Sequence, residues 1–289
     1  MATITICGKK YSIYIKDLDI SFKELTELPE EIQCLTNLEK LDCRNNKITS
    51  LDNLPHNLKY LNCSFNLITS LDNLPPNLIN LYCPHNQISS LDNLPANLEI
   101  LHCSKNNIIS LDHLPCSLKE LDCTGIKITS LNYLPLSLER LLCAYNEIIS
   151  LDYLPHNLIE LICYHNKITS LDYLPYCLKY LNCSKNKITS LDTLPPNLLG
   201  LDCYCNQISS LDNLPANLEI LTCFFNKITS LNYLPSSLKY VCCNGNKITQ
   251  LPYLPANLEG LDCYNNPFIY EFEPTIKKIK AYHKQFEIL

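Results

Sequence analysis

Residues 61–78 read LNCSFNLITSLDNLPPNL, and residues 181–198 read LNCSKNKITSLDTLPPNL. The same pattern, Leu or Val followed two residues later by Cys, recurs every 20 residues from Leu41 to Leu261. Twelve units follow one another without an insertion or deletion and share the pattern L-x-x-L-x-C-x-x-N-x-I-x-S-L-D-x-L-P. Such a fixed period indicates a solenoid, in which each unit buries its apolar side chains against its neighbours.

A thirteenth, divergent unit precedes these twelve. In residues 15–41, IKDLDISFKELTELPEEIQCLTNLEKL, the apolar residues Ile15, Leu18, Ile20 and Leu25 take the same relative places. The solenoid is therefore expected to contain about 13 units.

The repeat resembles the leucine-rich repeat family over residues 15–266. Its 20-residue length and the LP after each turn are similar to the short repeats of secreted bacterial effectors. The unbroken cysteine ladder is similar to leucine-rich repeat proteins of giant viruses of amoebae. The resemblance implies a horseshoe-shaped solenoid with a concave parallel β-sheet and a role as an interaction module. Twenty residues cannot hold both a strand and a return helix of about 10–12 residues, so we expect a convex side that is extended or polyproline-like.

Alternation of side chains along each strand predicts which residues point inward. For the unit that begins at Leu58, the predicted interior residues are Leu58, Leu61, Cys63, Ile68, Leu71 and Leu74. Burial of one Leu or Ile contributes roughly 1.5–3 kcal/mol. The constant letters of the repeat are therefore interpreted as packing residues.

An asparagine recurs once in nearly every unit, and its amide can satisfy backbone groups left open where the strand turns. This asparagine ladder contains Asn46, Asn66, Asn86, Asn106, Asn146, Asn166, Asn186, Asn206, Asn226, Asn246 and Asn266. Ile126 interrupts it. We expect a local distortion at this unit, with weaker amide-exchange protection at Ile126 than at its neighbours.

Both ends of a solenoid need covers, because they otherwise expose core and strand edges. Residues 1–14 alternate on either side of Gly8-Lys9-Lys10 and predict a β-hairpin cap. Residues 15–266 form the solenoid, and residues 267–289 predict a helical cap, the whole being one domain. In the helical cap, Pro274 suits a first turn. The residues at helical spacing are Ile276, Ile279, Tyr282 or His283, and Phe286.

Composition indicates a folded protein: 46% of the residues are hydrophobic and the net charge is −6. The mild acidity disfavours bulk attraction to nucleic acid or to an anionic membrane. Neither a signal peptide nor a run of roughly 18 apolar residues is recognised, so we expect neither secretion nor a transmembrane segment. Eighteen cysteines in a chain of this kind suit an intracellular, reducing compartment.

Twelve of these cysteines occupy the inward strand position, and four interpretations compete. In the first interpretation they are small buried hydrophobic residues. In the second they form disulfides between neighbouring units, since the strand spacing of about 4.8 Å meets the distance requirement of a disulfide. They are zinc ligands, although a ladder does not converge on one point, or they are catalytic thiols, although an apolar core raises thiol pKa. The first interpretation is favoured.

Three further patterns bear on chemistry. His102 is expected about 5 Å from Asp122 on the neighbouring strand, beside Tyr82, but no nucleophile accompanies this pair.

An aspartate row precedes x-L-P, and it suits turn hydrogen bonds better than calcium binding. Its members are Asp52, Asp72, Asp92, Asp112, Asp152, Asp172, Asp192 and Asp212. A basic edge, interpreted as solvation rather than nucleic-acid binding, comprises Lys47, Lys127, Lys167, Lys187, Lys227 and Lys247.

The letters that change between units fall where side chains leave the concave sheet. They are rich in Tyr, Phe, His and Arg, which are typical anchors of protein interfaces. The candidate protein-binding residues are Tyr60, Phe65, Tyr82, His85, His102, Arg140, Tyr145, Tyr164, His165, Tyr180, Tyr204, Phe224, Phe225, Tyr240 and Tyr264. Unselected drift at exposed positions is the competing interpretation.

These patterns favour a non-enzymatic protein-protein interaction module with no cofactor and no metal. By resemblance, its partner is a host or self protein, as in a viral or effector-like protein. Effector relatives that carry a ubiquitin-ligase domain suggest an enzymatic alternative, but the residues after Asn266 are too few for such a domain or for an F-box. The other alternative is a structural or virion component that assembles through its ends or its convex face.

Overall fold

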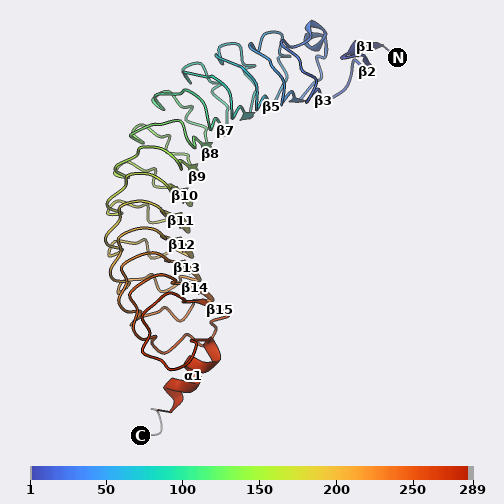
Figure 1. Cartoon of the computed structure of the whole chain (residues 1–289). Coiled ribbons are helices and arrows are strands. Elements are labelled where there is room, and N and C mark those ends of the chain that lie inside the picture. Colours follow the sequence, from blue (N-terminus) through green and yellow to red (C-terminus); the bar gives the residue numbers. More distant parts are fainter. Residues whose placement is uncertain (1, 286–289) are drawn as a thin grey trace. The chain divides into compact units, whose positions relative to one another are not determined.

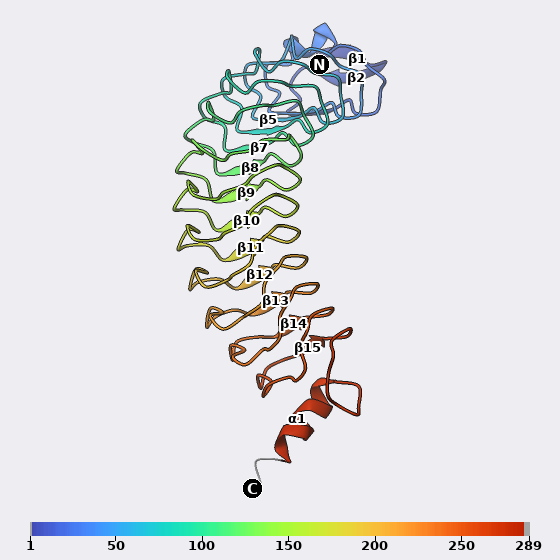
Figure 2. The same cartoon turned by 60° about the vertical axis from the view of Figure 1, so that its left-hand side comes forward.

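The computed structural model of the protein describes residues 2–285. The chain forms two compact units, Met1–Asn146 and Glu147–Leu289. Within each unit, successive coils repeat the same path, and each coil contributes one short strand to a parallel sheet (Figures 1 and 2).

An antiparallel hairpin of β1 (Thr3–Ile6) and β2 (Lys9–Ser12) begins the first unit and confirms the predicted N-terminal hairpin. The predicted position of its turn was wrong. The turn is Cys7–Gly8, with φ of 48° and 77°, and Lys9 and Lys10 belong to β2. A two-residue turn with two positive φ angles matches the twist of the flanking strands, which explains the difference.

The predicted repeat solenoid is confirmed in both units, whose neighbouring strands are parallel and in one-to-one register. The first unit contains β3 (Asp17–Asp19), η1 (Glu30–Cys34), β4 (Lys40–Asp42), β5 (Tyr60–Asn62), β6 (Asn80–Tyr82), β7 (Ile100–His102), β8 (Glu120–Asp122) and β9 (Arg140–Leu142). The second contains β10 (Glu160–Ile162), β11 (Tyr180–Asn182), β12 (Gly200–Asp202), β13 (Ile220–Thr222), β14 (Tyr240–Cys242), β15 (Gly260–Asp262) and α1 (Ile276–Lys284).

The interior of each coil follows the predicted alternation, with two kinds of exception. Leu58, Leu61 and Cys63 are fully buried, and the corresponding residues of the other coils are buried except Leu261 of the last coil, which is half-buried. Leu74, however, is only half-buried, and Pro75 occupies the interior instead. The Pro75 carbonyl accepts a hydrogen bond from the amide of Leu78 at 3.1 Å, so the chain turns tightly here with the proline ring inward.

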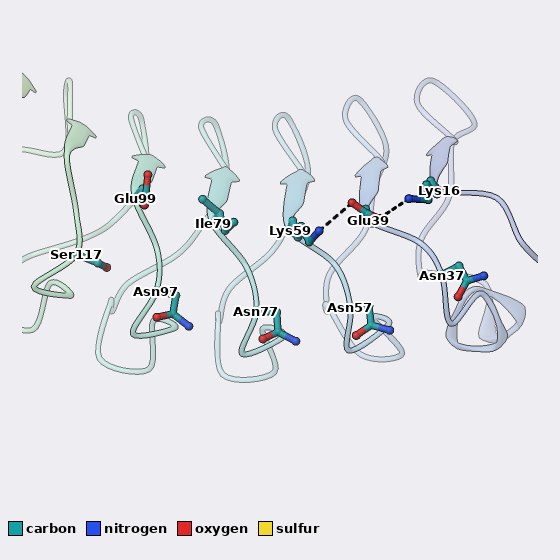
Figure 3. Close-up of a pocket in the computed structure, with 10 residues that line it drawn as sticks. All are labelled: Lys16, Asn37, Glu39, Asn57, Lys59, Asn77, Ile79, Asn97, Glu99 and Ser117. Carbon is teal, nitrogen blue, oxygen red and sulfur yellow. Dashed lines mark hydrogen bonds and ion pairs between the residues drawn. The ribbon is translucent and has the colours of Figure 1, made fainter.

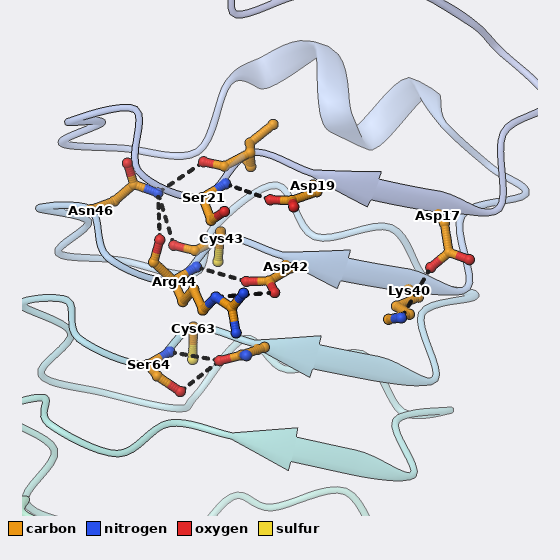
Figure 4. A network of polar contacts seen from close by, with 12 residues as sticks. Asp17, Asp19, Ser21, Lys40, Asp42, Cys43, Arg44, Asn46, Cys63 and Ser64 are labelled. Carbon is orange, nitrogen blue, oxygen red and sulfur yellow. Dashed lines mark hydrogen bonds and ion pairs between the residues drawn. The ribbon is translucent and has the colours of Figure 1, made fainter.

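The predicted asparagine ladder lies where the strand turns. In the second unit, Asn186 Oδ1 accepts from the Ile168 amide at 3.0 Å, and its Nδ2 donates to the carbonyls of Cys163 (3.1 Å) and Cys183 (3.0 Å). Figure 4 shows the equivalent contacts of Asn46 in the first unit. Each such asparagine therefore joins two successive coils.

The interruption of the ladder at Ile126 changes the local backbone, as expected. Asn146 Oδ1 accepts from both Ile126 N (3.1 Å) and Ile128 N (3.2 Å), and Lys127 adopts a left-handed φ of 68°. Within residues 2–285 the amide of Ile108, which a ladder asparagine at position 126 would satisfy, has no acceptor. The weaker exchange protection of this region stays a prediction.

The twelve ladder cysteines are all buried, and the structure describes all eighteen cysteines as free thiols. Desolvation by burial raises the pKa of Cys63 and Cys163 to about 12. These side chains are protonated packing residues at neutral pH, because a buried thiolate would lack compensating charge.

A thiol reagent added to the native protein is expected to label six cysteines. Cys7, Cys34, Cys116 and Cys177 are exposed and should react first, before the half-buried Cys205 and Cys242. The ladder thiols should react only after denaturation. Timed labelling followed by peptide mass mapping measures this, and rapid native labelling at several ladder positions would contradict the buried assignment.

Helix α1 follows β15 in the second unit and confirms the predicted C-terminal helix. Thr275 is its N-cap, accepting a hydrogen bond from Lys278 N at 3.3 Å, so Pro274 precedes the helix instead of lying in its first turn. Ile279 is buried as predicted, while Phe286 lies outside the described residues. Across residues 2–285, every helix is too short or too polar to cross a membrane.

Candidate functional site

The fifteen candidate residues all point outward from the sheet, and we call this side of each unit its strand face. Its members lie at the first and third positions of each strand and in the two residues that follow the buried cysteine. All fifteen are half-buried or exposed. The structure places them on two strand faces, one in each unit.

A row of contacts crosses β4 to β7 on the first strand face. The Lys40 ammonium lies 5.2 Å from the centre of the Tyr60 ring. The ring centres of Tyr60 and Tyr82 are 5.2 Å apart. Those of Tyr82 and His102 are 4.8 Å apart, in an edge-to-face ring arrangement. Adjacent aromatic and cationic side chains therefore form a continuous outward surface.

The carboxylate partner of His102 differs from the prediction. The strand register pairs His102 with Asp122, but its Nε2 contacts Glu120 Oε1 at 2.8 Å. Arg140 donates to the same oxygen at 3.1 Å. Asp122 instead accepts a hydrogen bond from the Thr124 amide at 2.9 Å. Glu120 is thus shared between an imidazole and a guanidinium, an arrangement suited to holding side chains in place.

The residue two positions after the buried cysteine has a left-handed backbone in all twelve coils from Leu41 onward. Phe65, Tyr145 and Phe225 have φ of 55°, 54° and 53°, and their side chains are 49%, 42% and 56% exposed. Asn and Gly adopt this conformation at the least cost, and they do occupy the equivalent positions Asn45 and Gly245. Bulky aromatic residues here cost roughly 1–2 kcal/mol of backbone strain each.

Several of these strained residues meet a neighbour on the strand face. In the first unit the rings of Phe65 and His85 stack at 4.3 Å. In the second unit Tyr204 and Phe224 stack at 4.3 Å, and Phe225 lies edge-on to Phe224 at 5.4 Å.

The remaining candidates make more dispersed contacts. The Lys105 ammonium lies 5.3 Å from the Tyr145 ring centre. Tyr240 and Tyr264 donate their hydroxyls to Glu259 (2.6 Å) and Asp262 (2.9 Å). Tyr180 leans over Gly200 on the neighbouring strand.

A polar groove of about 720 Å³ on the flank of the first unit was missed in the sequence (Figure 3). Asn57 and Asn77 line it, and Glu39 accepts hydrogen bonds from Lys16 (2.9 Å) and Lys59 (3.0 Å). These two ammonium groups, Lys16 first, lower the pKa of Glu39. The sequence signal that could have revealed this groove is the asparagine directly before the first interior leucine of successive units. Because its charges pair with one another, the groove is less suited to a charged ligand than its composition suggests.

The turn face is the side of each unit that carries the aspartate row. Ser70 Oγ accepts a hydrogen bond from the Asp72 amide at 3.1 Å, so the serine makes the turn, in place of the expected aspartate side chain. The Asp72 carboxylate accepts from Ser70 and from Asn93 of the next coil (2.8 Å), and these bonds lower its pKa. The aspartates thus link coils. Among residues 2–285, no three His, Cys, Asp or Glu side chains converge on a possible metal position.

Exposed tyrosines on the turn face were also missed in the sequence. Tyr153, Tyr173 and Tyr176 of the second unit are more exposed than most strand-face aromatics. The sequence signal for Tyr153 and Tyr173 was the replacement of Asn by Tyr in LDNLP, giving LDYLP, whereas Tyr176 follows the LP of its unit.

Known proteins share this architecture. The family described as leucine-rich repeats (2 copies) matches residues 15–56, 36–76 and 156–196. No match was found among curated proteins. The chain is similar to the solved structure of YopM from Yersinia enterocolitica WA-314, with 34% identity and a TM-score of 0.74, covering 89% of this chain and 59% of that one.

Two further solved structures are similar. The functional domain of InlJ from Listeria monocytogenes, described as including a cysteine ladder, has 30% identity and a TM-score of 0.71, covering 87% of this chain and 63% of that one. YopM from Yersinia pestis, described as a leucine-rich effector protein, has 27% identity and a TM-score of 0.67, covering 92% and 87%. The chain thus spans less than two thirds of the first two relatives.

Proposed function

Because the chain is a leucine-rich repeat protein, we propose that it is a non-enzymatic binding module whose strand faces engage a partner protein. Solenoids of this kind present extended surfaces on a stacked backbone, which loses little conformational entropy on binding. The similarity to an effector protein of Yersinia pestis supports a host-directed role for this surface.

The observation that carries the proposal is the left-handed backbone of outward aromatic residues. Drift at unconstrained positions would favour Asn or Gly wherever φ is near 55°, because they relieve strain. Phe65, Tyr145 and Phe225 retain large rings there and expose them to solvent. The left-handed conformation itself belongs to the repeat, since every coil has it; the large exposed rings kept there support binding.

Substitution of Phe225 by Asn separates binding from stability. Asn suits the left-handed backbone, as at Asn265, so the free energy of unfolding should stay within about 1 kcal/mol of the wild type or rise. Capture of partner proteins from host lysate, quantified by mass spectrometry, should fall at least ~10-fold, because exposed aromatic anchors dominate interfaces.

Substitution of Tyr173 by Asn is the matched control, since Tyr173 is an aromatic residue on the turn face of the same unit and is at least as exposed as Phe225. It should leave capture unchanged. The reverse pattern, with capture lost in the Tyr173 variant and kept in the Phe225 variant, would replace our proposal with assembly through the turn face. The exposed tyrosines at 153, 173 and 176 favour that second candidate, a structural or virion component.

A further inference from the structure

A hollow of about 390 Å³ opens on the strand face of the second unit, across β10 to β13. Ile162, Tyr180 and Ile220 supply apolar walls, and Glu160, Asn182 and Asp202 supply the polar groups of its lining. Pockets for small ligands usually measure about 300–1,000 Å³. A hollow at the low end of that range suits one long side chain better than a folded segment.

The hollow exists because Gly200 interrupts a row of larger side chains. The equivalent residues of the two neighbouring strands are Tyr180 and Ile220. A Cβ atom placed on Gly200 would lie 3.1 Å from Cδ1 of Tyr180, so the ring already leans across the gap. One face of a half-exposed tyrosine ring therefore borders the hollow.

Asp202 differs from the other aspartates at its position in the strand. Asp19, Asp42 and Asp122 each accept a hydrogen bond from the amide two residues ahead, at 2.9 to 3.1 Å. Asp262 accepts from the Tyr264 hydroxyl at 2.9 Å.

The side-chain contact of Asp202 is a long one, 3.5 Å from Asn182 Nδ2. Among residues 2–285 no Lys, Arg or His forms an ion pair with it. Its carboxylate is thus available to an incoming donor beside an apolar wall.

We propose that this hollow receives an arginine side chain of the partner protein, an assignment that rests on the proposed function of the strand face. The methylene stem would pack against Ile220, the neighbour of Gly200 in the strand register. The guanidinium would lie on the Tyr180 ring and donate two hydrogen bonds to Asp202. Arginine fits better than lysine because its planar group both stacks on aromatic rings and pairs with a carboxylate in two places.

The test titrates the isotope-labelled full chain with three amino-acid probes and follows backbone amide shifts by NMR. The probes are Nα-acetyl-arginine amide, its lysine analogue and its neutral citrulline analogue. The arginine probe should shift the amides of Tyr180, Gly200 and Asp202 with a dissociation constant of about 1–10 mM, as expected of one side chain. Citrulline should bind at least ~10-fold more weakly, because it keeps the shape and loses the charge.

Two variants and a matched control complete the test. Asp202→Asn, which reproduces the residue at Asn182, should weaken the arginine probe at least ~5-fold. Gly200→Val should fill the hollow and abolish the shifts. Asp262→Asn is the control, because Asp262 also follows a Tyr–Gly pair, Tyr240 and Gly260, but is held by Tyr264; it should change nothing.

Equal affinity for arginine and citrulline, or for arginine and lysine, would overturn the assignment. So would an arginine response that the Asp202 variant leaves intact. If no probe shifts these amides while Phe225→Asn still abolishes partner capture, the hollow is not a subsite, and the proposed function of the strand face stands. The two failures are therefore distinguishable.

Discussion

Raising the pH above 9 is expected to unfold the protein over a narrow range, because its ladder thiols are buried in the protonated form. Burial raises the pKa of eleven of them: to about 12 for Cys63 and Cys163, to about 11 for Cys263, and in the same direction at positions 43, 83, 103, 123, 183, 203, 223 and 243. An unfolded cysteine ionises near pH 8.5. Between these two pKa values the unfolded chain releases protons that the folded chain retains, so stability falls as pH rises.

The number of thiols makes this effect large. Each contributes a loss of about 1.4 kcal/mol per pH unit once the pH exceeds the unfolded pKa. Five of these eleven thiols lie in the first compact unit and six in the second, so the units should lose about 7 and about 8 kcal/mol per pH unit. Domains are typically stable by only about 5–15 kcal/mol, and we therefore expect a transition midpoint at about pH 9.5–10.

Far-ultraviolet circular dichroism between pH 7 and 11, with thiolate absorbance recorded in parallel, measures the transition. Structure and thiolate signal should change together. Replacing Cys63 in the first unit and Cys163 in the second by Ala should make the fall in unfolding free energy of each unit shallower by about 1.4 kcal/mol per pH unit, whereas replacing the exposed Cys116 and Cys177 should not. A protein that stays folded at pH 11 while its ladder thiols ionise gradually would contradict the prediction.

The interior was predictable from the sequence because each inward position recurs in twelve successive units. Leu61, Cys63 and Asn66 each represent a column, and the 20-residue period aligns the columns into the register that the strands adopt. Periodicity carries no information on rotamers, however. It paired His102 with Asp122 in register, yet the imidazole turns to Glu120, whose longer side chain reaches it.

The face of the sheet on which the candidate residues lie was also predictable, whereas their backbone conformation was not. Alternation from Leu221 and Cys223 places Phe224 outside, and the change of letter between units assigned Phe225 to the same side; both are outside in the structure. The left-handed conformation at Phe225 had a signal in its own column, where other coils carry Gly245 and Asn265. The hollow at Gly200 could not be foreseen, since its depth depends on how far the Tyr180 ring leans over the missing side chain.

Substitution of Asn186 by Ala is expected to lower the free energy of unfolding by about 3 kcal/mol. The change removes an acceptor from the buried amide of Ile168 and removes the donor to Cys163 O and Cys183 O. The carbonyls keep other donors after this change, whereas the Ile168 amide keeps no acceptor among residues 2–285. Asn166 and Asn206 also donate to these carbonyls, at 3.0 Å each, so the carbonyls remain partly satisfied.

Among residues 2–285 the Ile168 amide has no substitute acceptor, because its hydrogen bond there is to Asn186. A buried donor left without a partner costs about 1–3 kcal/mol, and each lost redundant hydrogen bond costs about 0.5–1.5 kcal/mol. Urea unfolding measures the sum. Amide exchange should locate the damage at Ile168, with loss of protection spreading to the adjacent coils.

Asn197→Ala is the matched control, since this exposed asparagine of the following coil makes a single bond, to Tyr176 O at 3.2 Å. It should cost less than about 1 kcal/mol. Ile126→Asn supplies the reciprocal test: the amide of Ile108 would regain an acceptor, and this variant should be more stable than the wild type by about 1 kcal/mol. If Asn186→Ala and Asn197→Ala were equally mild, or if Ile126→Asn destabilised the first unit, the ladder would be a consequence of stacking and not one of its causes.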